Sequence, residues 1–113
     1  MTDQEYRITL PVYLALTREC LHRITDAVSL LSHDASDAEA RRQLAFNLHA
    51  IRGGAAALGL RALAAEAERL ESWAVTDAKA FGPGRLAALY DAVGGLRKVI
   101  DEVERDLGAG AGR

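Results

Sequence analysis

Apolar residues recur every three or four positions along nearly the whole of this 113-residue chain. That spacing places them on one side of an α-helix, because the helix completes a turn every ~3.6 residues. β-branched residues are sparse, whereas alanine, leucine, arginine and glutamate, which favour helix, are abundant. The sequence therefore predicts an all-α protein without a sheet.

Breaks in the pattern separate four such stretches. Thr9 is the expected N-cap of the first helix, and Ser36-Asp37-Ala38-Glu39 has the sequence of a capping box before the second. Gly59 is placed to end the second helix in the left-handed conformation that glycine adopts readily, and Gly82-Pro83-Gly84 marks the break before the last helix. The predicted helices are roughly 10–32, 37–58, 61–75 and 84–107.

The connections between these helices are short, which places consecutive helices antiparallel. Alternating three- and four-residue spacing also favours shallow packing angles between them. We therefore expect an antiparallel up-down four-helix bundle, a single domain over residues 1–107. The tail 108–113, GAGAGR, is expected to be flexible.

Charge and composition exclude several classes of partner. The net charge is −2 with acidic and basic residues interspersed, so no surface for a nucleic-acid backbone is expected. No stretch approaches the ~20 apolar residues of a membrane span, and the first residues lack the layout of a secretory signal. Cys20 is the single cysteine, so an internal disulfide is excluded. We expect a cytoplasmic protein.

One strip of the second predicted helix has an unusual composition. It carries an imidazole, a guanidinium one turn later, and otherwise almost no side chain. It lies about a quarter-turn from the apolar stripe, and hence at the edge of the bundle. The neighbouring Gly53 and Gly54 together cost about 2 kcal/mol of helix stability, so we expect the bare surface to serve a purpose. The strip consists of Ala45, His49, Arg52, Gly53 and Ala56.

This composition suits a carrier of a phosphoryl group. Imidazole has a pKa near ~6.5, so at neutral pH it is largely uncharged and can attack phosphorus through a ring nitrogen. A cation one turn away can hold the phosphoryl oxygens as they arrive. We expect His49 to accept the phosphoryl group and Arg52 to stabilise it. The expected docking floor for a second protein consists of Ala45, Gly53, Gly54 and Ala56.

The run from His49 to Gly59, HAIRGGAAALG, closely resembles the signature of histidine-containing phosphotransfer (HPt) domains. That signature has a histidine, an aliphatic residue two positions on, a basic residue three on, and then glycine and small residues. A second glycine follows ten positions after the histidine, and a Leu-Glu pair ends the next helix. Downstream, the resemblance continues through Leu63, Ala67, Leu70 and Glu71.

The resemblance implies a relay in multistep two-component signalling of the bacterial type. The protein would accept a phosphoryl group from an aspartyl phosphate on one receiver domain and pass it to an aspartate on another. Its partners would be the receiver domains of hybrid sensor kinases and response regulators. His49 takes the position of the phosphoacceptor, and Arg52 stands where the family usually has lysine. Gly59, Leu63, Leu70 and Glu71 look structural.

On this interpretation the chain is a covalent phosphocarrier rather than an enzyme with its own pocket. No cofactor or metal is expected in it, and any Mg²⁺ would belong to the receiver, because the strip has no carboxylate cluster. Glu19 and His22 have the spacing of a di-iron motif, but that motif occurs once where such sites need it twice. Cys20, His22 and His33 lack the paired-ligand spacing of a zinc site.

Two alternatives remain open at this point. One is a helical adaptor that keeps the receiver-docking face but has lost phosphotransfer. The reason to consider it is the arginine at position 52, where the family usually has lysine. A histidine-kinase fragment would instead pair two helices per chain into a dimer around the histidine. Four helical stripes suffice for one self-contained bundle, so we expect a monomer.

Overall fold

The computed structural model describes residues 2–74 and 83–111 of the chain. Nearly all of this described part is helical and none of it is strand, which confirms the all-α prediction. The helices are α1 (Asp3–His33), α2 (Ala38–Ala57), α3 (Arg61–Ala74) and α4 (Pro83–Ala111).

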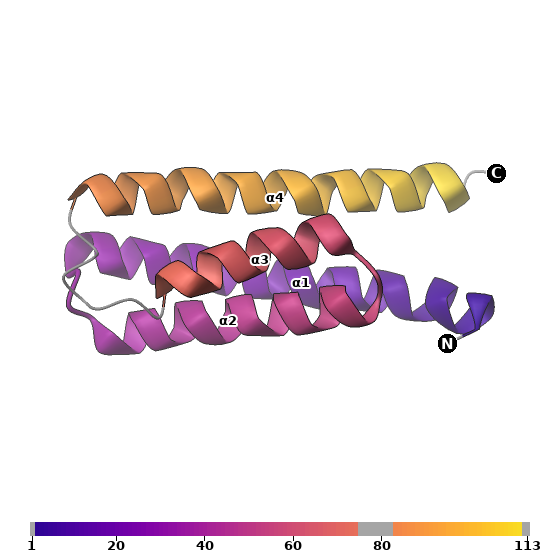
Figure 1. The fold of residues 1–113 in the computed structure, drawn as a ribbon, viewed down its shortest axis with the longest axis horizontal. Helices are drawn as coiled ribbons and strands as arrows, with labels where there is room; N and C mark the ends of the chain where they lie inside the picture. Colours follow the sequence, from indigo (N-terminus) through magenta and orange to yellow (C-terminus); the bar gives the residue numbers. More distant parts are fainter. Residues whose placement is uncertain (1, 75–82, 112–113) are drawn as a thin grey trace.

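The helices run alternately up and down, as Figure 1 shows. α1 packs against α2 and α4, and α3 packs against the same two helices, so the four enclose one core. This arrangement confirms the predicted antiparallel bundle. α1 and α4 are much longer than their neighbours and project beyond α2 and α3 at the end where both termini lie (Figure 1). The largest fully buried side chains include Ile24, Leu31, Leu44, Leu48, Ile51, Leu63, Leu70, Leu89, Leu96 and Ile100.

The first helix begins seven residues earlier than predicted, and Thr9 is not its cap. Thr2 is the N-cap: its side chain accepts the N–H of Glu5, and the Glu5 carboxylate accepts the N–H of Thr2. Pro11 follows Thr9 closely, as a proline in the first turn of a helix would, but it lies inside α1 on an exposed face. The capping-box spacing at Thr2 and Glu5 was present in the sequence.

The second helix was predicted to begin at residue 37, after a cap at Ser36, but α2 begins one residue later, at Ala38. Asp37, not Ser36, is the N-cap, and its carboxylate accepts the N–H of Ala40 at 3.0 Å. Ser36 is engaged elsewhere, because its hydroxyl donates to the carboxylate of Asp34 at 2.6 Å.

The turn between α2 and α3 is the one predicted at Gly59. This residue has φ +74°, and it is the one residue with positive φ among those described. The N–H of Leu60 donates to the carbonyl of Ala55 at 2.8 Å, and that of Gly59 to Ala56 at 3.2 Å, which together form a Schellman motif. The chain therefore reverses tightly, and α3 returns along α2.

α4 extends four residues into the tail that was predicted to be flexible, as far as Ala111. Residues 112 and 113 lie outside the described part of the chain, as does most of the predicted loop before α4. Within the described residues, no helix combines the length and the apolar content that crossing a membrane requires.

Candidate functional site

His49 stands near the middle of α2, on the side of the helix that points away from the core. Its imidazole is 64% exposed, whereas the neighbouring Leu48 and Ile51 are fully buried. Arg52 follows one turn later and is 37% exposed. The imidazole is therefore open to a docking protein while its helix is fixed by the core.

A third residue joins this pair from α3. The carboxylate Oε1 of Glu71 lies 2.9 Å from Nδ1 of His49, and its Oε2 lies 2.8 Å from Nε of Arg52. Nη2 of Arg52 lies 2.9 Å from the same Nδ1. The side chain of Glu71 is only 19% exposed, so the ion pair with Arg52 is partly shielded from water. The three side chains form a compact charged cluster around one ring nitrogen.

Glu71 was predicted to be structural, and its contact with His49 was not predicted. A signal for it exists in the chain, because His49 lies ten residues before Gly59 and Glu71 lies twelve residues after it. Two antiparallel helices joined by a tight turn bring residues at similar distances from that turn to the same level. The position of the turn therefore points to Glu71 as a neighbour of His49.

The two glycines beside His49 have different surroundings. Gly53 is exposed, and a Cβ built on it meets nothing within 4 Å. A Cβ on Gly54 would collide with the ring of Tyr13, which lies against α2 and donates its hydroxyl to the carbonyl of Ile51 at 2.7 Å. Burial raises the pKa of the Tyr13 phenol. Gly54 thus allows close packing of α1 on α2, while Gly53 leaves bare backbone at the surface.

The other two residues of the predicted docking floor also differ from each other in exposure. Ala56 is exposed, and Ala45 is half-buried against the core. The structure therefore brings His49, Arg52, Gly53 and Ala56 together at the surface of α2. Gly54 lies against Tyr13 of α1, and Ala45 packs against the core, so neither is fully part of this exposed surface.

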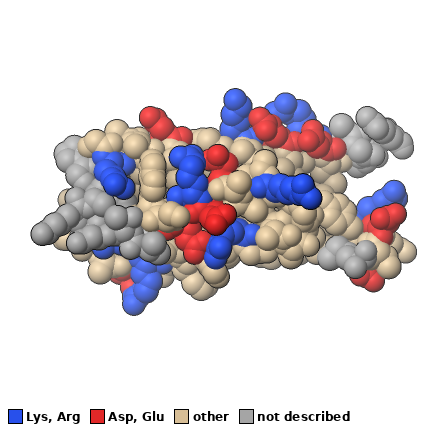
Figure 2. Space-filling view, viewed as in Figure 1, with Lys and Arg blue, Asp and Glu red and all other residues tan. Residues whose placement is uncertain are grey.

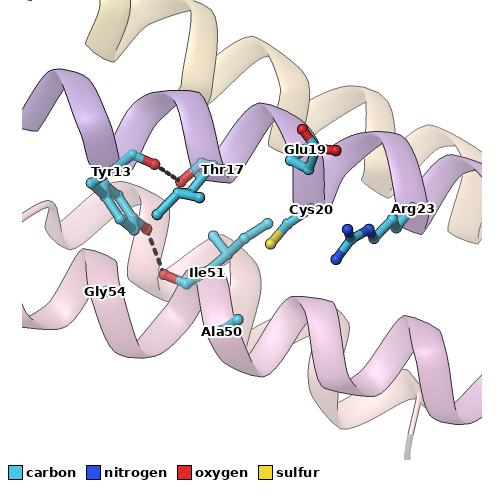
Figure 3. Close-up of a pocket in the computed structure, with 9 residues that line it drawn as sticks. Tyr13, Thr17, Glu19, Cys20, Arg23, Ala50, Ile51 and Gly54 are labelled. Carbon is cyan, nitrogen blue, oxygen red and sulfur yellow. Dashed lines mark hydrogen bonds between the residues drawn. The ribbon is translucent and has the colours of Figure 1, made fainter.

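On the α1 side of His49 the surface is apolar and hollowed. A groove of about 340 Å³ runs between α1 and α2, and Figure 3 shows the sulfur of Cys20 and the side chain of Ile51 directed toward it. Burial raises the pKa of the Cys20 thiol, so the thiol lines the groove in its neutral form. Leu16 lines the groove and is exposed to solvent. Other large apolar side chains of the same two helices are also exposed: Ile8 and Val12 on α1, and Phe46 on α2.

Other parts of the surface are charged and internally paired. Figure 2 shows acidic and basic side chains interleaved over one face of the bundle. On α3, Arg69 pairs with Glu66, and between α1 and α4, Arg18 pairs with Asp101 and Glu104. The described residues include no group of three or more His, Cys, Asp or Glu side chains placed to hold a metal ion.

Comparison with known families identifies the class of protein. The Hpt domain family matches residues 9–106, which is most of the chain. Comparisons with curated proteins and with solved structures gave no significant match. The chain belongs to the Hpt domain family, as its resemblance to the HPt signature predicted.

Membership of this family defines the general activity. Hpt domains are helical bundles that carry phosphoryl groups on histidine in phosphorelays, where they interact with receiver domains. The protein is accordingly a phosphocarrier.

Proposed function

We propose that His49 is the phosphoacceptor and that the protein relays a phosphoryl group between aspartates of two receiver domains. The observation that supports this most strongly is the exposed imidazole within the HAIRGGAAALG run, with a cation one turn away. The other histidines lack this setting. His33 has its Nδ1 2.9 Å from the carbonyl of Ser29 in the last turn of α1, and His22 lies on α1 outside the motif.

The groups that phosphoryl transfer needs come partly from this protein and partly from the receiver domain. His49 supplies the nucleophile and Arg52 supplies a cation that the phosphoryl oxygens can reach. A receiver domain supplies the aspartyl phosphate, the surrounding pocket and its own Mg²⁺. Phosphoryl transfer depends mainly on positioning and on stabilising charge, so an exposed helix can take part once the partner closes over it.

The apolar surface indicates where the partner sits. A standard interface covers ~800 Å² on each side, and packed helices lie only ~8–10 Å apart, so a partner over His49 also covers an adjacent helix. On α3 that neighbour presents Glu68, Arg69 and Ser72, whereas on α1 it presents exposed apolar side chains beside a groove. We infer that the receiver lies over α1 and α2, with Phe46 and Leu16 beneath it.

One chain provides all four helices of the bundle, which argues against the kinase-dimer alternative. The adaptor alternative differs in a single measurable property, the formation of phosphohistidine.

The test is transfer of ³²P from a phosphorylated receiver domain to the wild-type protein and to His49→Gln. We expect labelling of the wild type to be lost in His49→Gln and retained in the control variants His22→Gln and His33→Gln. Undiminished labelling of His49→Gln would contradict the proposal. Normal receiver binding by a wild-type protein that never acquires label would establish the adaptor instead.

A further inference from the structure

The outward face of α1 carries one continuous stripe of exposed side chains. Successive members lie three or four residues apart, so all of them fall within about 80° around the helix axis. The apolar members are each more than half exposed, and the charged members between them are exposed as well. This set, the α1 stripe, consists of Val12, Leu16, Glu19, Arg23, Asp26 and Leu30.

The two charged residues at the middle of the α1 stripe are not paired within the chain. Glu19 and Arg23 both line the groove on its α1 side (Figure 3), and neither has a hydrogen bond or ion pair with another residue that the structure describes. Arg18, by contrast, is paired with carboxylates of α4. An exposed carboxylate and guanidinium that lack partners are each available to an opposite charge on another molecule.

The order of residues along the α1 stripe is complementary to itself in the antiparallel direction. If a second copy of α1 lies antiparallel on the first, centred between Glu19 and Arg23, a two-fold axis repeats every contact. Apolar pairs then form the two ends of the contact, and oppositely charged pairs form its middle. The facing pairs are Val12 with Leu30, Leu16 with Asp26, and Glu19 with Arg23, each formed twice. Asp26 lies at one edge of the stripe, where its carboxylate stays in water.

We propose that the protein self-associates through the α1 stripe, as an antiparallel two-fold dimer. The contact from Val12 to Leu30 is roughly 27 Å long and about 10 Å wide, from the rise and diameter of a helix. This is well below the ~800 Å² per partner of a standard interface, so we expect a reversible dimer with a micromolar or weaker dissociation constant. Each chain keeps its own four helices, so the dimer joins two complete bundles.

Self-association regulates access to the phosphoacceptor. Leu16, Glu19 and Arg23 belong both to the α1 stripe and to the lining of the groove beside α2. A second copy on the stripe therefore covers the α1 side of the surface on which we place the receiver domain. The second copy and the receiver exclude each other, and the monomer is the form that exchanges phosphoryl groups. This consequence rests on the proposed function, whereas the dimer itself does not.

Reversal of the central charges tests the dimer, with analytical ultracentrifugation over a range of protein concentrations. Glu19→Arg places two arginines face to face, and Arg23→Glu places two glutamates face to face. Because the two-fold axis repeats each substitution, either variant should raise the dissociation constant at least about tenfold. The double variant restores opposite charges and should recover the wild-type value. An equimolar mixture of the two single variants should form a heterodimer, since every central pair is then opposite in charge.

The matched controls are Lys98→Glu and Glu102→Arg on α4, which reverse exposed charges four residues apart and away from the α1 stripe. Both should associate like the wild type, and circular dichroism checks that every variant is folded. A wild type that stays monomeric at all concentrations would overturn the proposal and leave the stripe to the receiver alone. A dimer that survives both single reversals at positions 19 and 23 would also overturn it, because another surface would then join the copies.

Receiver binding tests the regulation separately, by titrating a fluorescent receiver domain with the protein. Leu30→Glu should weaken the dimer, because it places a carboxylate against Val12, but it lies outside the groove. Well below the dimer dissociation constant, the wild type and Leu30→Glu should bind the receiver equally. At higher concentration the wild-type curve should rise less steeply, and identical curves would overturn the regulation. Failure of the proposed function would show elsewhere, as continued labelling of His49→Gln.

Discussion

The α1–α2 side of the bundle exposes apolar side chains, whereas other parts of its surface carry charged side chains that pair with one another. On α3 and between α1 and α4, charged groups are paired with one another within the chain, as Glu66 is with Arg69 and Arg18 with Glu104. Beside His49, the exposed side chains of Leu16 and Phe46 are apolar, and 60% and 66% of their surfaces face solvent. Charged groups that are already paired within the chain gain little from contact with a partner, whereas burying exposed apolar surface beneath a partner is favourable.

The largest effect should follow from placing a charge on the apolar side. Leu16→Glu should weaken receiver binding tenfold or more, equivalent to at least about 1.4 kcal/mol, because it would leave a carboxylate beneath the partner. The stability of the free protein should change little, since Leu16 is exposed. Titration of a receiver domain by calorimetry measures the binding.

Leu30→Glu is the matched control for this prediction. Leu30 is also an exposed leucine of α1, but it lies three residues from the end of that helix, far along it from Leu16. It should leave receiver binding unchanged. Equal losses in the two variants would show that the apolar side near His49 is not the docking surface.

The two glycines should respond in opposite directions to the same substitution. Gly53→Ala should raise the free energy of unfolding by about 1 kcal/mol, since alanine favours helix and the added methyl group meets nothing. Gly54→Ala should lower it, because displacing the Tyr13 ring costs about 1–3 kcal/mol and disrupts its hydrogen bond to Ile51. Chemical denaturation of both variants measures the difference.

A second substitution separates this clash from other effects. In a Tyr13→Ala background the ring is absent, so Gly54→Ala should no longer destabilise the protein relative to that background. If both glycine variants prove equally stable, the close approach of α1 to α2 does not depend on Gly54.

The smallest effect concerns the ion pair between α1 and α4. Arg18 donates to both carboxylate oxygens of Glu104 at 2.8 Å, and this hydrogen bonding lowers the pKa of Glu104 below its usual value. Because the folded-state pKa is lowered, the stabilisation is complete above the usual glutamate pKa and is lost as the pH falls through the lowered value. Both side chains are 37% exposed, so its magnitude should stay below about 1 kcal/mol.

The measurement compares thermal unfolding of the wild type and Glu104→Gln at neutral and at acidic pH. The wild type should be slightly more stable at neutral pH, and the difference should vanish in acid. Receiver binding should be the same for both proteins. A clear loss of binding in Glu104→Gln would show that the charged side also contacts the partner.

Local signals predicted the fold, and contacts between distant residues limited the prediction of the site. The helical stripes and the left-handed turn at Gly59 depend on neighbouring residues, so they could be predicted from the sequence. The packing of Tyr13 on Gly54 joins residues on two helices, and helical periodicity does not specify which residues of two helices meet. The contact between Glu71 and His49 also joins two helices, and the signal for it is the position of the Gly59 turn rather than the helical periodicity. The misplaced caps had local causes, because a competing signal lay nearby in each case.

The central claim is that His49 alone carries the phosphoryl group, on an exposed edge of the bundle. The most direct measurement is ³¹P NMR of the protein after phosphorylation by a receiver domain, with the modified residue located by mass spectrometry at alkaline pH. We predict one acid-labile phosphohistidine signal, attached to Nε2 of His49 and absent from His49→Gln. A signal on His22 or His33, or one that persists in His49→Gln, would contradict the account.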